Sequence, residues 1–146
     1  MSRVPRNDWV RMAGWTAVAA LMLAATPWAA MAEAGPNATT TQLSTDRSVT
    51  FKVTPKAIGL QETRWEFNVV LDTHSADISD DLVQSATLTT GDGLTLKPST
   101  WVETVPGGHH REGVLAFDVA VPRPTTIELR IARPGETTPR TFRWQL

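Results

Sequence analysis

From Ser48 to the C-terminus, apolar and polar residues alternate with a period of two in a series of short runs. Successive side chains of a β-strand point to opposite faces, so this alternation predicts strands with one buried face and one wetted face. The alternation predicts seven strands, whose apolar members are Val49, Phe51 and Val53; Trp65, Phe67, Val69 and Leu71; Ala86 and Leu88; Leu94 and Leu96; Leu115, Phe117, Val119 and Val121; Ile127, Leu129 and Ile131; and Phe142, Trp144 and Leu146.

Turn-forming residues separate these runs. Pro55 and Pro134-Gly135 fall between strand sets, and Asp92-Gly93 is typical of a tight hairpin turn. Seven short strands at this spacing indicate an all-β fold, an antiparallel immunoglobulin-like sandwich, with a small closed barrel as the alternative. One short helical turn is expected over residues 79–83, with Ser79 as its cap.

The first 32 residues have the features of a Sec-type signal. Three arginines against one aspartate make residues 1–11 positive, and an apolar run follows from Met12 to Ala25. The small residues of Ala30-Met31-Ala32 fit a signal-peptidase site, so we expect an N-terminal signal helix that is cleaved after Ala32. Cleavage after Ala34 is one alternative. Another is retention as a membrane anchor, since the run approaches the roughly 20 residues that span a bilayer.

The remaining chain divides into a tail and a domain. Residues 33–47 have no burial pattern, and the run Gly-Pro-Asn-Ala-Thr-Thr-Thr-Gln within them predicts a flexible N-terminal linker. Residues 48–146 hold all seven strand sets and predict one β-sandwich domain. Export predicts a periplasmic or secreted location for it, without a membrane span once the signal is removed.

Composition narrows the partners of this domain. The chain has a net charge of −1, and loss of residues 1–32 removes three Lys+Arg and one Asp+Glu, which leaves −3. Such mild acidity argues against nucleic acid, which needs a basic footprint. All four methionines lie in the signal segment and cysteine is absent, so the core must be stable without disulfides.

The three histidines are the main candidates for chemistry. His74 lies in the sequence LDTHS and His109 and His110 in PGGHHREG, both between strand sets. Loops at the end of a rigid sandwich commonly carry functional residues. If the two loops meet, the three imidazoles and the carboxylate of Asp72 could converge on Zn²⁺ or Cu²⁺, the metals that this donor set suits.

Two other interpretations of these loops stay open. In the first, Arg111 pairs with Asp72 or Glu112 and the loops are internal braces that carry no ligand. In the second, oxygen ligands of the acidic segment hold Ca²⁺, although the EF-hand spacing is absent. No nucleophile-and-base motif is visible in the sequence, so a catalytic role is not predicted. The acidic segment contains Asp72, Asp77, Asp80 and Asp81.

The histidine motifs also carry a resemblance. The sequences LDTHS and PGGHHREGVLAF, closed by RTFRW at residues 140–144, resemble a family of small exported prokaryotic β-sandwich domains of unassigned function. The resemblance covers about Val53 to Trp144. It implies that the two motifs define the domain, and it implies no activity.

These observations predict an exported, non-enzymatic β-sandwich. The leading hypothesis is that it binds a transition metal, Cu²⁺ or Zn²⁺, through His74, His109, His110 and Asp72. The alternative is a structural or protein-interaction module, with Arg111 and Glu112 as braces and another envelope protein as partner.

Overall fold

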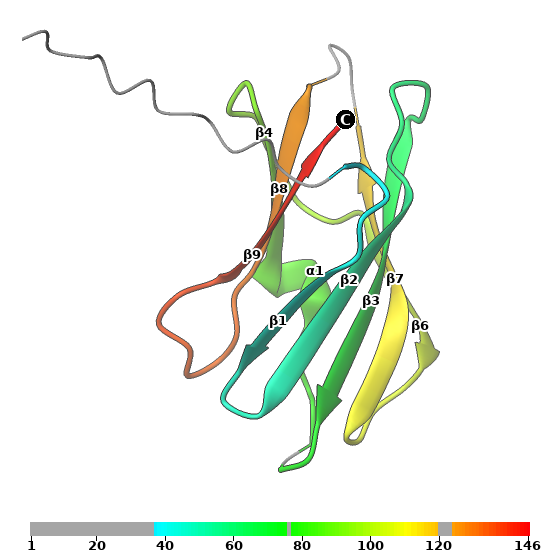
Figure 1. The fold of residues 1–146 in the computed structure, drawn as a ribbon. Coiled ribbons are helices and arrows are strands. Elements are labelled where there is room, and N and C mark those ends of the chain that lie inside the picture. The colour runs from blue at the N-terminus through cyan, green and yellow to red at the C-terminus, as the bar shows by residue number, and fades with distance from the viewer. Residues whose placement is uncertain (1–36, 76, 120–123) are drawn as a thin grey trace, which may run out of the picture. The chain divides into compact units, whose positions relative to one another are not determined.

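A computed structural model describes residues 37–75, 77–119 and 124–146 (Figure 1). The chain divides into two units, 1–32 and 33–146, and the description concerns the second. The predicted signal segment, its cleavage site and Val121 lie outside the described residues. Within the described part of the chain, no helix is long and apolar enough to cross a membrane.

Nine strands and one short helix make up the described fold. In chain order they are β1 (Gln42–Asp46), β2 (Val49–Ala57), β3 (Arg64–Thr73), α1 (Leu82–Ser85), β4 (Ala86–Thr90), β5 (Thr95–Leu96), β6 (Thr100–Val105), β7 (His110–Asp118), β8 (Thr126–Ile131) and β9 (Arg140–Gln145).

The strands form two antiparallel sheets that face each other (Figure 1). The five-stranded sheet has the order β1-β2-β3-β7-β6, and the four-stranded sheet has the order β5-β4-β8-β9. With β1 set aside, these are the ABED and C′CFG orders of immunoglobulin domains. The predicted all-β, immunoglobulin-like sandwich is therefore confirmed.

The core lies between the sheets and is made by the alternating apolar residues. Trp65 and Phe67 on β3 are fully buried, as are Phe142 and Trp144 on β9. The Phe67 ring lies 5.3 Å from that of Trp144, so aromatic side chains join the two sheets. Leu94 is the exception, since it is 49 % exposed in the β4–β5 turn.

Three local features differ from the sequence prediction. Strand β1 lies inside the segment predicted to be a linker, and its polar side chains explain why no burial pattern marked it. Pro55 lies within β2 at an irregularity in its pairing, where proline is tolerated. The cap of α1 is Asp81 and not Ser79, because the Asp81 carboxylate accepts hydrogen bonds from Val83 N and Gln84 N.

A tight turn at Arg47-Ser48 joins β1 to β2. Both residues have positive φ angles, 46° and 63°. These angles are typical of the two-residue turns that match the twist of a hairpin, although glycine or asparagine usually occupies such positions. The turn brings β1 alongside β2 over its full length, from Gln42↔Val53 to Asp46↔Val49.

Polar contacts join β1 and the residues before it to β9, and we call this the β1–β9 seam. The Gln42 side-chain amide donates to Arg143 O (2.5 Å) and accepts from Arg143 N (3.3 Å). The Trp144 indole donates to Thr40 O (2.7 Å), and Asn37 forms an isolated bridge with Gln145. The seam thus occupies backbone groups at an edge of each sheet.

Candidate functional site

The two histidine-bearing loops meet at one end of the sandwich (Figure 1). The backbone N–H of Thr73 donates to His109 O (2.8 Å), and that of Ile78 donates to Gly108 O (2.9 Å). Gly108 has a φ of 73°, a conformation that glycine adopts at little cost. The condition on which the candidate site depended, that the loops share an end, is therefore met.

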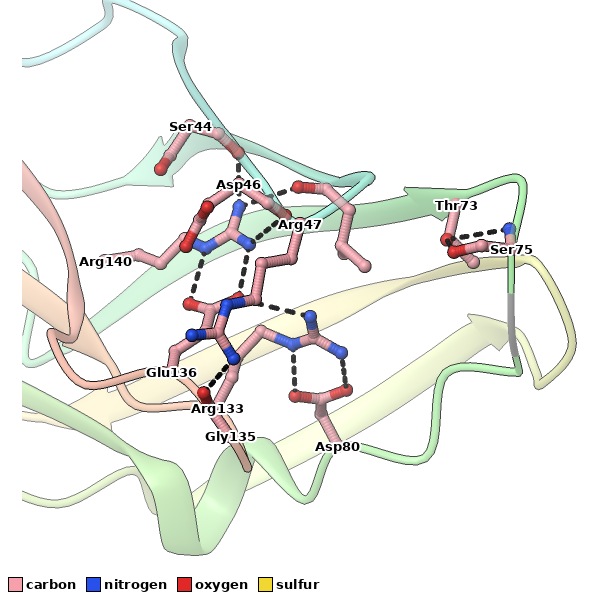
Figure 2. A network of polar contacts seen from close by, with 11 residues as sticks. Ser44, Asp46, Arg47, Thr73, Ser75, Asp80, Arg133, Gly135, Glu136 and Arg140 are labelled. Atoms are coloured by element: carbon pink, nitrogen blue, oxygen red, sulfur yellow. Dashed lines mark hydrogen bonds and ion pairs between the residues drawn. The ribbon is translucent and has the colours of Figure 1, made fainter.

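The histidine side chains do not gather at one point. His110 Nδ1 pairs with the Asp72 carboxylate, because the two residues are cross-strand partners on β7 and β3. His109 Nε2 lies 3.9 Å from Asp77 Oδ1. The turn that contains His74 is closed by Ser75 N, which donates to the Thr73 hydroxyl (3.3 Å), as Figure 2 shows.

Among the described residues, no group of three or more His, Cys, Asp or Glu side chains is placed to hold a metal ion. The carboxylate near His109 is that of Asp77, whereas His110 lies between those of Asp72 and Glu112, so the two imidazoles share no carboxylate in these contacts. The metal site at His74, His109, His110 and Asp72 stays a prediction.

Arg111 links several elements, but its partners differ from those expected. Its guanidinium donates to the Glu103 carboxylate on β6 and to Asp80 O (2.7 Å) before α1. Arg111 is opposite buried Leu71 and points inward, whereas Asp72 is the next residue and points to the outer face.

Glu112 also lies on the outer face of the five-stranded sheet. It accepts a hydrogen bond from the Asn68 side chain on β3 (2.9 Å), and its second oxygen lies 3.9 Å from His110 Nε2. Glu112 therefore joins neighbouring side chains of one sheet, and its contacts are independent of those of Arg111.

Glu103 is held as a carboxylate by its neighbours. The hydrogen bond from Arg111 lowers its pKa most, and a second from the Trp101 indole (3.1 Å) lowers it further. Both donors use Oε1. Glu103, Trp101, Arg111, Ser79, Asp80 and Asp81 line a groove of about 390 Å³.

A chain of ion pairs continues from Asp80 into the β8–β9 loop (Figure 2). The Asp80 carboxylate accepts two hydrogen bonds from Arg133, at 2.7 Å and 2.9 Å. Arg133 also donates to Glu136 (3.3 Å), which in turn accepts from Arg140 at 2.6 Å and 3.0 Å. We call Asp80, Arg133, Glu136 and Arg140 the buried ion-pair network.

Arg140 connects this network to the β1–β2 hairpin. Its guanidinium donates to three backbone carbonyls, those of Ser44 (2.7 Å), Val49 (2.8 Å) and Asp46 (2.9 Å). It also lies 4.9 Å from the centre of the Phe51 ring, within the range of a cation–π contact. Every side of this buried charge is thus occupied by a group that stabilises it.

The ionisation of the network follows from these contacts. The hydrogen bond to Asp80 raises the pKa of Arg133. The hydrogen bond from Arg140 lowers the pKa of Glu136, and Arg133 lowers it further. Opposite charges that are paired and hydrogen-bonded keep each other ionised despite their burial. Arg133 and Glu136 are therefore both charged at neutral pH, within a network that joins the two sheets.

Sequence reasoning missed Glu103, Arg133, Glu136 and Arg140, although one signal was available. Arg140 stands two residues before Phe142 and four before Trp144, in phase with the inward face of β9. Arg111 is likewise in phase with inward-facing Leu115 on β7. An arginine in apolar register must find buried acceptors, so its phase points to an internal ion pair.

Comparison with known proteins adds one structural likeness. No family model and no curated protein matches the chain. Among solved structures, a secreted protein from Mycobacterium tuberculosis, MPT63, matches with a TM-score of 0.46 and 14 % sequence identity, over 77 % of this chain and 96 % of that chain. At these values the likeness carries no argument about function.

Proposed function

We propose that this protein is an exported, non-enzymatic β-sandwich that acts as a binding module, with its His/Arg loops as internal braces. One observation carries the proposal: the inward-facing Arg111 guanidinium binds Glu103 and the backbone of Asp80. A cation committed to these contacts joins β6, β7 and the segment before α1. Export is supported by the signal features of residues 1–32.

The edges of the sheets favour binding through a face. Strands β1 and β9 are engaged in the seam, and β5 has only two residues. Strand β6 has a pairing irregularity between Glu103 and Val105, and Glu103 is an inward-facing charge. Bulges, short edges and inward charges all oppose the addition of another strand.

Brace and metal site predict different responses to substitution. If Arg111 is a brace, the substitution Arg111→Met should lower the unfolding free energy by roughly 1–3 kcal/mol in the absence of metal. The reason is that the Glu103 carboxylate and Asp80 O lose their hydrogen-bond donor. Arg64→Met is the matched control, since the Arg64 side chain is 42 % exposed and its contacts lie at the surface: ion pairs with Glu66 and Asp118 and a hydrogen bond to the Thr100 hydroxyl. Its effect should stay within about 1 kcal/mol in urea unfolding.

Metal titration supplies the other half of the test. We expect neither Zn²⁺ nor Cu²⁺ to raise the melting temperature of the metal-free protein more than that of a variant with His74, His109 and His110 all changed to Ala. Metal that stabilises the parent and not this variant would establish the metal hypothesis in place of the brace.

A further inference from the structure

A groove of about 390 Å³ lies over β4, β8 and β9 of the four-stranded sheet, away from the histidine loops. Ile127, Leu129 and Ile131 of β8 are buried, so the alternate residues Thr126, Glu128 and Arg130 point outward. All three of these outward residues line the groove.

The strand register brings polar side chains from three strands into one row. Glu128 is paired with Thr89 of β4 on one side and with Arg143 of β9 on the other. Both of these neighbours line the groove with it. The backbone pairing of the sheet therefore fixes their spacing.

Glu128 holds two arginines at once. Its Oε1 pairs with Arg130 Nε and its Oε2 with Arg143 Nε. The Glu128 side chain is only 16 % exposed, whereas those of Arg130 and Arg143 are 53 % and 66 % exposed. One carboxylate thus orients two guanidiniums, and this group of three side chains has a net charge of +1.

Among the described residues, the Nη atoms of the two arginines donate no hydrogen bond, so they can serve an incoming acceptor. Each arginine uses Nε in its hydrogen bond to Glu128, and guanidinium N–H groups form a planar fork that suits oxyanions. Thr89 and Thr126, which both carry hydroxyl groups, line the same groove, and the Thr89 hydroxyl lies 3.5 Å from that of Thr95. An oxyanion with hydroxyl groups beside it matches this pattern of donors.

Gly91 also shapes the groove. Its backbone N–H donates to Thr126 O (2.8 Å), and a Cβ at this position would overlap the Thr126 hydroxyl. The absence of a side chain at Gly91 thus keeps Thr126 in place at the groove.

We propose that this groove binds an acidic saccharide, with Arg130 and Arg143 holding its carboxylate and the threonines its hydroxyl groups. The site rests on the binding role proposed above and names its ligand class. The net charge of −1 disfavours long polyanions such as nucleic acid, so recognition is confined to this local positive group. A neutral sugar would leave the guanidiniums without a ligand acceptor.

Calorimetric titration with trigalacturonic acid tests the site, with its fully methyl-esterified form as the uncharged control ligand. We expect the acid to bind the full chain and the ester to bind at least tenfold more weakly, which corresponds to a difference of about 1.4 kcal/mol in binding free energy. Binding should weaken at higher salt, because the arginines are exposed.

The Arg130→Gln, Arg143→Gln double variant should lose about tenfold or more in affinity. Arg143→Lys keeps the charge without the planar fork and should lose part of it. Arg64→Gln on the other sheet should bind like the parent, and circular dichroism will show whether each variant is folded.

Three results would overturn the site: no binding of the acid at millimolar concentration, equal binding of the ester, or an equal loss in Arg64→Gln. Should the double variant fail to fold, Arg143→Lys with unchanged affinity would contradict it as well. The brace test concerns Arg111 and the histidines, so either proposal can fail without the other.

Discussion

Arg140 and Glu136 show how a sandwich without disulfides can place charge between its sheets. Arg140 is 4 % exposed, and burial of an unpaired guanidinium would be strongly unfavourable. Carbonyl groups of Ser44, Asp46 and Val49 together with the Glu136 carboxylate offset this cost. Such a pair affects stability most when it is broken, because removal of one partner leaves the other charge buried and unpaired.

The lowered pKa of Glu136 predicts a loss of stability in acid. A carboxyl group with a lower pKa in the folded than in the unfolded state contributes stability above its ordinary value of 4.5. This contribution is lost as the pH falls through the folded-state pKa. We expect the unfolding free energy of the parent to fall more steeply below pH 4.5 than that of Glu136→Gln.

Urea unfolding at a series of pH values from 7 to 3 measures this difference. Glu103 also has a lowered pKa, but it titrates in both proteins and cancels in the comparison. Parallel pH profiles for parent and variant would show that Glu136 is not coupled to Arg140 in solution.

At the same scale, the sequence singled out the two histidine loops but left open whether they meet, and it did not predict which side chains pair. The LDTHS and PGGHHREG segments meet because β3 and β7 are neighbours in the five-stranded sheet, a pairing that the alternation pattern does not report. The partners of Arg111 could not be predicted for two reasons. They depend on whether its side chain points inward or outward, and one of them lies in a loop, residues 79–81, whose path no periodic pattern describes. Arg140 could have been identified from its phase, whereas three of its acceptors are backbone carbonyls, which the sequence cannot distinguish from other backbone groups.

At the level of elements, the alternation of apolar residues located the core strands, because such alternation indicates a strand that is buried on one face. It missed β1 and β6. Leu43 on β1 is 68 % exposed, and Val102 and Val105 on β6 are 57 % and 41 % exposed. Edge strands with little buried surface carry no period-two signal, so tertiary pairing alone defines them.

Gly113 on β7 depends on one of these edge strands. A Cβ at Gly113 would lie 2.5 Å from Val102 O and 2.7 Å from the Trp101 ring of β6. We expect Gly113→Ala to lower the unfolding free energy by about 1–3 kcal/mol through overpacking and to shift the fluorescence of Trp101.

Gly59→Ala is the control for this substitution. Its Cβ would approach nothing closer than 3.7 Å, and Gly59 has no positive φ. Thermal unfolding of the two variants makes the comparison. Equal stability would mean that β6 does not pack closely against Gly113.

For the whole molecule, the seam makes residues 37–46 part of the folded domain. Deletion of residues 33–47 would remove the carbonyls that accept from Trp144 and Arg140, and would expose the edge of β2. We expect a chain of residues 48–146 to melt below a chain of residues 33–146. The reason is that a buried charge loses hydrogen-bond partners and Val49 loses its strand neighbour.

Differential scanning calorimetry measures the melting temperatures of the two chains, and circular dichroism shows whether each chain is folded. A flexible linker would leave the melting temperature unchanged. An intermediate chain of residues 41–146 retains β1 without Thr40 and so separates the contribution of the strand from that of the indole contact.

The direction of the seam has a mechanical consequence. Its contacts run from Asn37 beside Gln145 to Asp46 beside Arg140, so the earliest described residues lie next to the last ones. Tension applied between residues 37 and 146 would break these contacts one after another, in an unzipping geometry. The seam would yield at low force and in a fixed order, before the pairing of β2, β3 and β7 bears load.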